Sequence, residues 1–194
     1  MTTLLLDSSN TLLNVGFMKD DSLLCSTNYE SWQSQSEHMI PEIDKLMEEY
    51  SITRSDISSI IVAIGPGSYT GVRIALTIAK VMALALNIPI YPVSSLRVLK
   101  NGKIPSICLI NARSNRSYFA VYEDEKTIVA DTIKTNDEVL TYINEHPEYS
   151  VCGDARYLGF ENNDTNICLQ MVSLAKYLTP VENDLGLKPV YMKD

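Results

Sequence analysis

The fold is decided by residues 65–86, which read GPGSYTGVRIALTIAKVMALAL. They follow SIIVAI at 59–64, a continuous apolar run of strand length that is typical of a strand covered on both faces. The glycines and the proline mark a turn, and the apolar run after them predicts a helix from about 70 to 86. The stretch is therefore expected to form a strand, a glycine-rich loop and a helix, as in layered α/β folds.

The glycine-rich loop has two interpretations. Such a loop at a helix N-terminus commonly binds phosphate, because backbone N–H groups and the helix dipole both favour an anion. However, it lacks the G-K-[ST] of a Walker loop, and its G-x-G-x-x-x-G spacing is one residue longer than the dinucleotide fingerprint. The alternative, which the spacing favours, is that the glycines allow close backbone approach while Ser68 or Thr70 caps the helix. The residues that a nucleotide site would use are Asp7, Ser8, Gly65, Gly67, Ser68 and Thr70.

The helix at 70–86 is apolar over well beyond half of its circumference. A helix that lies on its own sheet needs an apolar arc of only about 100° or slightly more. A second face must therefore be covered, either by the preceding helix, expected at 37–50, or by another polypeptide. The single polar stripe consists of Arg73, Thr77, Lys80 and Asn87, with Leu84 among them.

The rest of the chain repeats one plan. Strand-like runs at 4–6, 12–18 and 23–28 precede the helix at 37–50. The same order returns after residue 100, in CLINARSNRSYFAVYEDEKTIVADT, a helical pattern after Thr135 and a short strand at 150–152. We therefore predict a two-lobed, duplicated α/β fold with a βββαβα plan. Its N-terminal lobe should span 1–100, and a reduced βββαβ lobe should span 101–194, with the boundary near 100–103.

Composition limits the classes of function. Hydrophobic residues make up 45% of the 194, enough for a core without disulfides or metals. The formal net charge of −8, with only 16 scattered Lys and Arg, argues against direct nucleic-acid binding. The four cysteines form no C-x-x-C pair, which is typical of buried thiols in a reducing compartment. No signal segment or apolar stretch of about 18 residues is evident, so we expect a cytoplasmic protein that does not enter membranes.

The same residues resemble a known family. The block GPGSYTGVRIALTIAKVMALALNIPIYPVSSL at 65–96 is similar to the signature of the bacterial TsaB (YeaZ) family. LLLDSSN, SEHMIPEIDKLM, LINARSNRSYFAVYE and PVYMKD are similar to further parts of it, so the resemblance covers most of the chain. It implies the fold of the actin, sugar-kinase and heat-shock-chaperone ATPase superfamily. It also implies a non-catalytic subunit, without catalytic or metal-binding residues of its own, that dimerises with its catalytic paralogue TsaD.

The resemblance further implies a reaction and partners. The family's complex transfers a threonylcarbamoyl group to the adenosine 3′ of the anticodon in tRNAs that read codons starting with A. The ATPase TsaE is a further partner, and tRNA would be bound only through the complex. No cofactor is implied for this chain itself, ATP or ADP could bind in the assembled complex, and the chain alone would form a homodimer. The helices at 39–50 and 70–86 would contact the paralogue through His38, Met39, Ile43, Leu46, Met47, Tyr50, Tyr69, Val72, Arg73, Ala75, Leu76, Ala79, Met82 and Ala83.

The chain departs from the family's pattern in the second lobe. Asn111 stands where the family has the Asp of an Asp-Ala-Arg sequence, which weakens the case for a metal–phosphate site between the lobes. His38 and Glu42 stand where the catalytic paralogue has two metal-binding histidines. No third ligand is evident, so a solvated or interface His38 is favoured. Trp32, in a polar loop, is expected to pack on its own lobe.

Two other functions are weighed against this one. An independent nucleotide-binding ATPase or small-molecule kinase of the same superfamily is favoured by Asp7 and the glycine loop, but disfavoured by Asn111 and the short second lobe. A peptidase ranks last, because Ser68 has no evident activating histidine.

Overall fold

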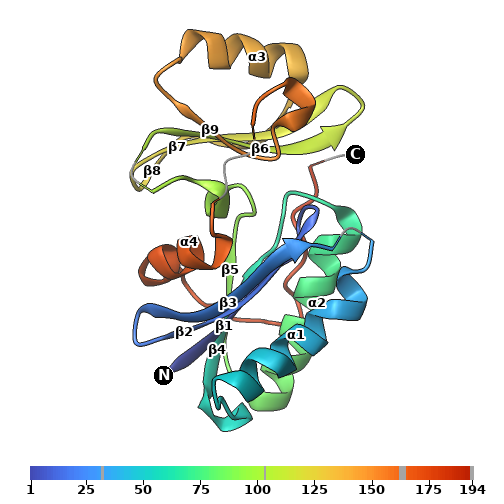
Figure 1. Ribbon diagram of the computed structural model, residues 1–194, viewed down its shortest axis with the longest axis vertical. Coiled ribbons are helices and arrows are strands. Elements are labelled where there is room, and N and C mark those ends of the chain that lie inside the picture. The colour runs from blue at the N-terminus through green and yellow to red at the C-terminus, as the bar shows by residue number, and fades with distance from the viewer. Residues whose placement is uncertain (32, 103, 162–164, 193–194) are drawn as a thin grey trace.

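The computed structural model describes residues 1–31, 33–102, 104–161 and 165–192, and Trp32 lies outside them. Its first sheet has the strand order β3-β2-β1-β4-β5 (Figure 1). The first three strands form an antiparallel meander, and β4 and β5 run parallel to β1. The strands are β1 (Thr2–Asp7), β2 (Leu12–Lys19), β3 (Ser22–Glu30), β4 (Ile57–Ala63) and β5 (Ile90–Val93).

The second sheet repeats this arrangement without the outermost strand. Its order is β8-β7-β6-β9, with an antiparallel meander and β9 parallel to β6. In both sheets the fourth strand in the chain therefore pairs with the first, which confirms the predicted duplicated α/β fold. The strands are β6 (Ser106–Arg113), β7 (Arg116–Glu123), β8 (Lys126–Thr135) and β9 (Ser150–Gly153).

Helices cover the outer face of each sheet. α1 (Gln35–Glu49) and α2 (Tyr69–Leu86) lie side by side on the first sheet, and α3 (Asn136–Glu145) lies on the second (Figure 1). The predicted helices at 37–50 and 70–86 are confirmed to within two residues at each end. Short 3₁₀ turns occur at Arg54–Asp56, Arg97–Leu99, Arg156–Leu158 and Ala175–Tyr177.

The C-terminal part of the chain returns to the first lobe. α4 (Ile167–Leu174) packs on β1, β2 and β3, on the face opposite α1 and α2. The sequence interpretation placed all of 101–194 in the second lobe, whereas α4 contacts the strands of the first lobe. The reason is that α4 is apolar on almost every side, so it fills the space between the two sheets with Ile167, Cys168 and Met171.

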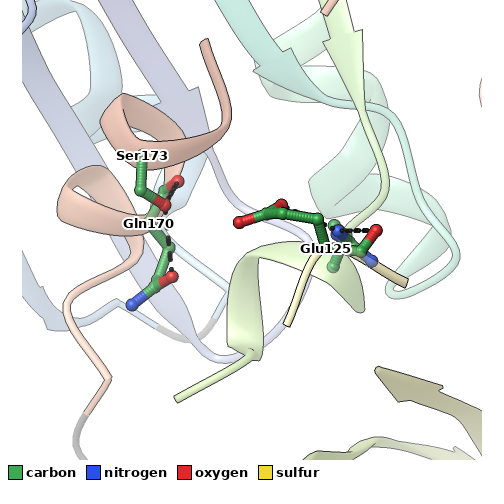
Figure 2. A network of polar contacts seen from close by, with 4 residues as sticks. Glu125, Gln170 and Ser173 are labelled. Carbon is green, nitrogen blue, oxygen red and sulfur yellow. Dashed lines mark hydrogen bonds and ion pairs between the residues drawn. The ribbon is translucent and has the colours of Figure 1, made fainter. Parts of the chain in front are cut away.

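Polar contacts also connect the lobes. Ser94, after β5, donates its hydroxyl to the carboxylate of Asp131 on β8 at 2.5 Å. Arg97 donates to both the carbonyl and the carboxylate of Glu125 in the β7–β8 turn, at 2.9 and 3.2 Å. In Figure 2 the Glu125 carboxylate points towards α4, where Ser173 donates to the carbonyl of Gln170 at 2.8 Å. The lobes are thus joined by side chains as well as by the shared apolar core.

The segment after α4 covers part of α2. Val190 donates its N–H to the carbonyl of Ile64 at 2.7 Å, and Lys80 donates to the carbonyl of Leu185 at 3.0 Å. Arg73 donates to the Tyr191 hydroxyl at 2.6 Å. The chain's own C-terminal segment therefore lies along the polar stripe of α2, and its Val181 and Leu187 pack against the core of the first lobe. The sequence interpretation did not consider this occupant.

By length and composition, α2 is apolar enough to cross a bilayer. Core helices of soluble proteins pass the same test, and Val72, Ala75 and Ala79 of α2 are buried in the core of the first lobe. This result is therefore weak evidence for a membrane span.

Candidate functional site

The glycine loop packs directly on the loop that follows β1. The backbone N–H of Ser68 donates to the carbonyl of Ser9 at 2.6 Å, and the Ser8 hydroxyl donates to the carbonyl of Gly71 at 2.7 Å. A Cβ at Gly71 would lie 1.9 Å from the Ser8 carbonyl oxygen, and one at Gly67 would lie 2.3 Å from that of Ser9. The Ser68 hydroxyl accepts the N–H of Gly71 and caps α2. The loop's glycines therefore permit close backbone approach, as the spacing favoured.

Gly65 serves the C-terminal segment in the same way. Its φ is +107°, a conformation that favours glycine, and a Cβ there would lie 2.7 Å from the carbonyl oxygen of Val190. Its N–H donates to the Ser95 hydroxyl at 3.0 Å, and its carbonyl accepts from the Ser95 N–H. The backbone of Gly65 is thus fully engaged inside the first lobe.

Asp7 is buried and bonded to neutral groups. Its carboxylate accepts from the N–H of Ser9 at 2.9 Å and from the side-chain amide of Asn14 at 3.1 Å. Burial raises the pKa of Asp7, and the hydrogen bonds from Ser9 and Asn14 oppose this only in part. Because Asp7 and Ser8 are at most 1% exposed, their side chains do not fit the role of nucleotide or metal contacts.

The burial of Asp7 predicts a pH-dependent difference in stability. Because its folded pKa is raised, its contribution to stability is present below the unfolded pKa and is lost as the pH rises through the folded pKa. Asp7→Asn cannot ionise, and the unpartnered Oδ1 of Asn14 can accept from the new amide once the Asn14 amide rotates. The variant should melt a few degrees higher than the parent at pH 7, and the two should converge below about pH 4.

Thermal melts followed by circular dichroism between pH 3 and pH 8 would measure this difference. Asp44→Asn, at an exposed position on α1, is the matched control and should leave the melting temperature unchanged. A lower melting temperature for Asp7→Asn at every pH would contradict the argument.

A cleft of about 720 Å³ separates the two lobes. Gly67, Ser68, Tyr69 and Thr70 line it from the first lobe, and Asn111, Arg113, Tyr118 and Asp154 line it from the second. A second hollow of about 420 Å³ shares Asn10, Thr11 and Asp154 with this cleft. Of the six residues predicted for a nucleotide, the structure therefore brings Gly67, Ser68 and Thr70 to the cleft, and leaves Asp7, Ser8 and Gly65 out of its lining.

The charged groups of the cleft do not form a metal site. Burial raises the pKa of Asp154, which Arg156 opposes. The side-chain carbonyl of Asn111 accepts from the N–H of Arg113 at 2.8 Å, so this residue shapes the β6–β7 turn. Within the part of the chain that the structure describes, no group of three or more His, Cys, Asp or Glu side chains could hold a metal ion.

His38 and Glu42 are engaged with the strand before α1. The His38 Nδ1 lies 2.9 Å from the Ser31 hydroxyl, and Glu42 accepts from the Tyr29 hydroxyl at 3.3 Å. Both residues therefore hold α1 against the end of β3. His38 is exposed, in agreement with the favoured interpretation.

The structure corrects much of the predicted partner contact. Eight of the fourteen residues lie in the chain's own core, where they cannot reach a partner. They are Met39, Ile43, Leu46, Val72, Ala75, Leu76, Ala79 and Ala83. The other six are exposed or half-buried: His38, Met47, Tyr50, Tyr69, Arg73 and Met82.

Sequence reasoning missed the larger apolar side chains that the two helices expose. Ile40 on α1 is 53% exposed, and Val81 and Leu84 on α2 are 62% and 69% exposed. On the same two helices, Met47, Ile74, Ile78 and Met82 are half-buried and pack against the core of the first lobe. We call this set the helix-pair surface: Ile40, Met47, Ile74, Ile78, Val81, Met82 and Leu84. Large exposed apolar side chains on two neighbouring helices are typical of a surface that binds a partner.

Comparisons with known proteins agree with the fold. The family model described as "TsaD: tRNA N6-adenosine threonylcarbamoyltransferase" matches residues 30–177. The TsaB protein of Bacillus subtilis is 32% identical over 72% of this chain, and that of Escherichia coli is 26% identical over 65%. The chain spans only 63% and 57% of the lengths of these two relatives. A Pseudomonas aeruginosa structure with similarity to peptidase YeaZ covers 99% of both chains with a TM-score of 0.80, at 20% identity, which shows a shared fold.

Proposed function

The chain belongs to the TsaD family, in its TsaB (YeaZ) branch, and on this premise we propose that it is a non-catalytic subunit that pairs with the catalytic paralogue TsaD. The complex would transfer a threonylcarbamoyl group to the adenosine 3′ of the anticodon in tRNAs that read codons starting with A. The relatives from Bacillus subtilis and Escherichia coli are named tRNA threonylcarbamoyladenosine biosynthesis proteins, which supports this pathway but states no role for a single subunit.

The observation that carries this proposal is the helix-pair surface. Val81 and Leu84 expose more than half of their apolar side chains on the outer face of α2. A partner that covers them gains the transfer free energy of about 25 cal/mol per Å² of apolar area. Internal contacts of the glycine loop and the loop after β1 support the non-catalytic assignment. Asp7, Ser8, Gly65 and Gly71 bond or pack within the first lobe rather than facing a substrate.

The further partners follow from the same complex. The net charge of −8 supports binding of tRNA mainly by TsaD rather than by this chain. TsaE would join the pair. This chain would require no cofactor of its own, and ATP or ADP would bind in the assembled complex. Without TsaD, the exposed apolar surface favours a homodimer. The place of action would be the cytoplasm, without a membrane.

Size-exclusion chromatography with light scattering tests the pairing. The chain is measured alone, with TsaD from the same organism, and with TsaD and TsaE in ATP or ADP. We expect a one-to-one complex with TsaD, and threonine incorporation into tRNA that requires both subunits. No complex under any nucleotide condition would contradict the proposal. It would favour an independent ATPase or small-molecule kinase that uses the cleft between the lobes.

A further inference from the structure

Two cysteines face each other in the second sheet. Cys108 on β6 and Cys152 on β9 are direct register partners in the parallel pair. Both are 0% exposed and belong to the same apolar cluster, so their side chains lie on the same face of the sheet. Neighbouring strands are about 4.8 Å apart, and disulfides join residues whose Cα atoms are about 4.4–6.8 Å apart. The Cα spacing expected of register partners therefore lies within the range found in disulfides.

The two thiols are not equivalent. The Cys108 thiol lies within hydrogen-bonding reach of the Cys152 sulfur. Cys152 lies 3.7 Å from both the carbonyl and the hydroxyl oxygen of Ser150. The hydrogen bond from Cys108 lowers the pKa of Cys152, whereas burial raises the pKa of Cys108. The pair thus consists of a nucleophilic sulfur and a neighbouring thiol that can resolve its oxidised form.

The position of β9 provides access to the pair. It is a four-residue strand at the edge of its sheet, paired only with β6. It ends at half-buried Gly153, which lines the 420 Å³ hollow. Local opening of this edge strand would let a small oxidant in the hollow reach the two sulfur atoms, which are buried when the strand is closed.

We propose that Cys108 and Cys152 are an oxidisable dithiol that forms an intrachain disulfide when it meets a peroxide. The Cys152 thiolate attacks the peroxide, so that an S–O bond forms, the O–O bond breaks and hydroxide leaves and is protonated to water. The Cys108 sulfur then attacks the sulfenic acid, an S–S bond forms, and a second water leaves. Two thiols and one hydrogen peroxide give one disulfide and two waters, with the two sulfur atoms oxidised and the peroxide reduced.

The disulfide would join β9 covalently to β6 beside the cleft. Asp154 directly follows β9 and lines the cleft, so the disulfide would restrict the movement of Asp154 at the wall of the cleft. Cross-linking also constrains the unfolded chain, so the oxidised protein should melt several degrees higher than the reduced protein.

The other two cysteines provide an internal control. Cys25 lies on β3 and Cys168 on α4, so no strand pairing sets their spacing. Burial raises the pKa of each. They should remain thiols under conditions that oxidise the pair on β6 and β9.

Mass spectrometry tests the proposal on the full chain. Folded protein is exposed to increasing hydrogen peroxide, then denatured, alkylated and digested with trypsin. The four cysteines lie in separate tryptic peptides, 20–45, 104–113, 135–156 and 157–176. We expect 104–113 linked to 135–156, at least tenfold more abundant than any other linked pair. In Cys108→Ser the link should be lost and Cys152 should be found as a sulfenic acid, trapped with dimedone.

Two results would overturn the proposal. One is full alkylation of Cys108 and Cys152 at peroxide concentrations that link two separate peptides, residues 104–113 and residues 135–156, when these are mixed in solution. The other is a similar abundance of links among all four cysteines, which would indicate oxidation of unfolded chains. Circular dichroism shows whether Cys108→Ser folds. If it does not fold, the linked peptides of the oxidised parent protein still test the proposal.

Discussion

Gly71→Ala should lower the free energy of unfolding by about 3 kcal/mol, at the upper end of what overpacking usually costs. The new Cβ would lie 1.9 Å from the carbonyl oxygen of Ser8, a contact with backbone that no side-chain rotation can relieve. Moving the loop away would also stretch the hydrogen bond from the Ser8 hydroxyl to the Gly71 carbonyl. Urea denaturation followed by circular dichroism measures this loss of free energy of unfolding. A variant that does not fold at all would be the largest loss the measurement can show.

Thr70→Ala is the matched control, because Thr70 precedes Gly71 in the first turn of α2 but is exposed. It should change the free energy of unfolding by less than about 0.5 kcal/mol. The comparison also separates the two interpretations of the glycine loop. If the loop were an open cradle for phosphate, Gly71→Ala would remove ligand binding and leave stability nearly unchanged.

The sequence predicted the parts of the fold whose patterns are local. SIIVAI at 59–64 is a continuous apolar run of strand length, the run at 37–50 has a clear helical period, and the structure places β4 and α1 there. α4 has no such pattern, because ICLQMVSL is apolar around most of its circumference and is buried between two sheets. The C-terminal segment was missed for a related reason. Its contacts include the Val190 N–H donating to the Ile64 carbonyl and Arg73 donating to the Tyr191 hydroxyl. These contacts join residues over a hundred positions apart and leave no periodicity in the sequence.

The candidate site was predicted less well than the fold. The sequence identified α2 as the helix with an uncovered apolar face, but assigned its alanines to the partner. In the structure Ala75, Ala79 and Ala83 face β4, because their small side chains let the helix approach the sheet closely. A helix that is apolar over more than half of its circumference does not reveal which arc meets the sheet. Only the packing shows that the larger Val81 and Leu84 remain outside.

Similarly, Asp7 follows a strand in the position expected for a ligand-binding carboxylate, but sequence position does not determine exposure. The loop after β1 turns inward against the glycine loop, and this buries both Asp7 and Ser8. Gly67 and Gly71, which suggested a phosphate site, are the residues that allow this burial.

The correction to α2 changes which substitution tests partner binding. A charge at Ala79 enters the core of the first lobe, so Ala79→Glu should prevent folding. The combined Val81→Glu and Leu84→Glu variant instead places two charges on the exposed part of the helix-pair surface. It should fold normally and lose at least about thirtyfold in affinity for TsaD, as expected for apolar side chains at the centre of an interface.

Isothermal titration calorimetry with TsaD measures the affinity, and circular dichroism verifies the fold. Leu169→Glu is the control, because Leu169 is also a large exposed apolar residue, 51% exposed, but lies on α4 at the opposite face of the first sheet. It should bind TsaD as the parent does. Equal losses for Leu169→Glu and the α2 variant would indicate a general effect of added charge on an acidic chain. A folded α2 variant with unchanged affinity would show that the partner binds elsewhere, since the exposed apolar face of α2 would then be unnecessary for pairing.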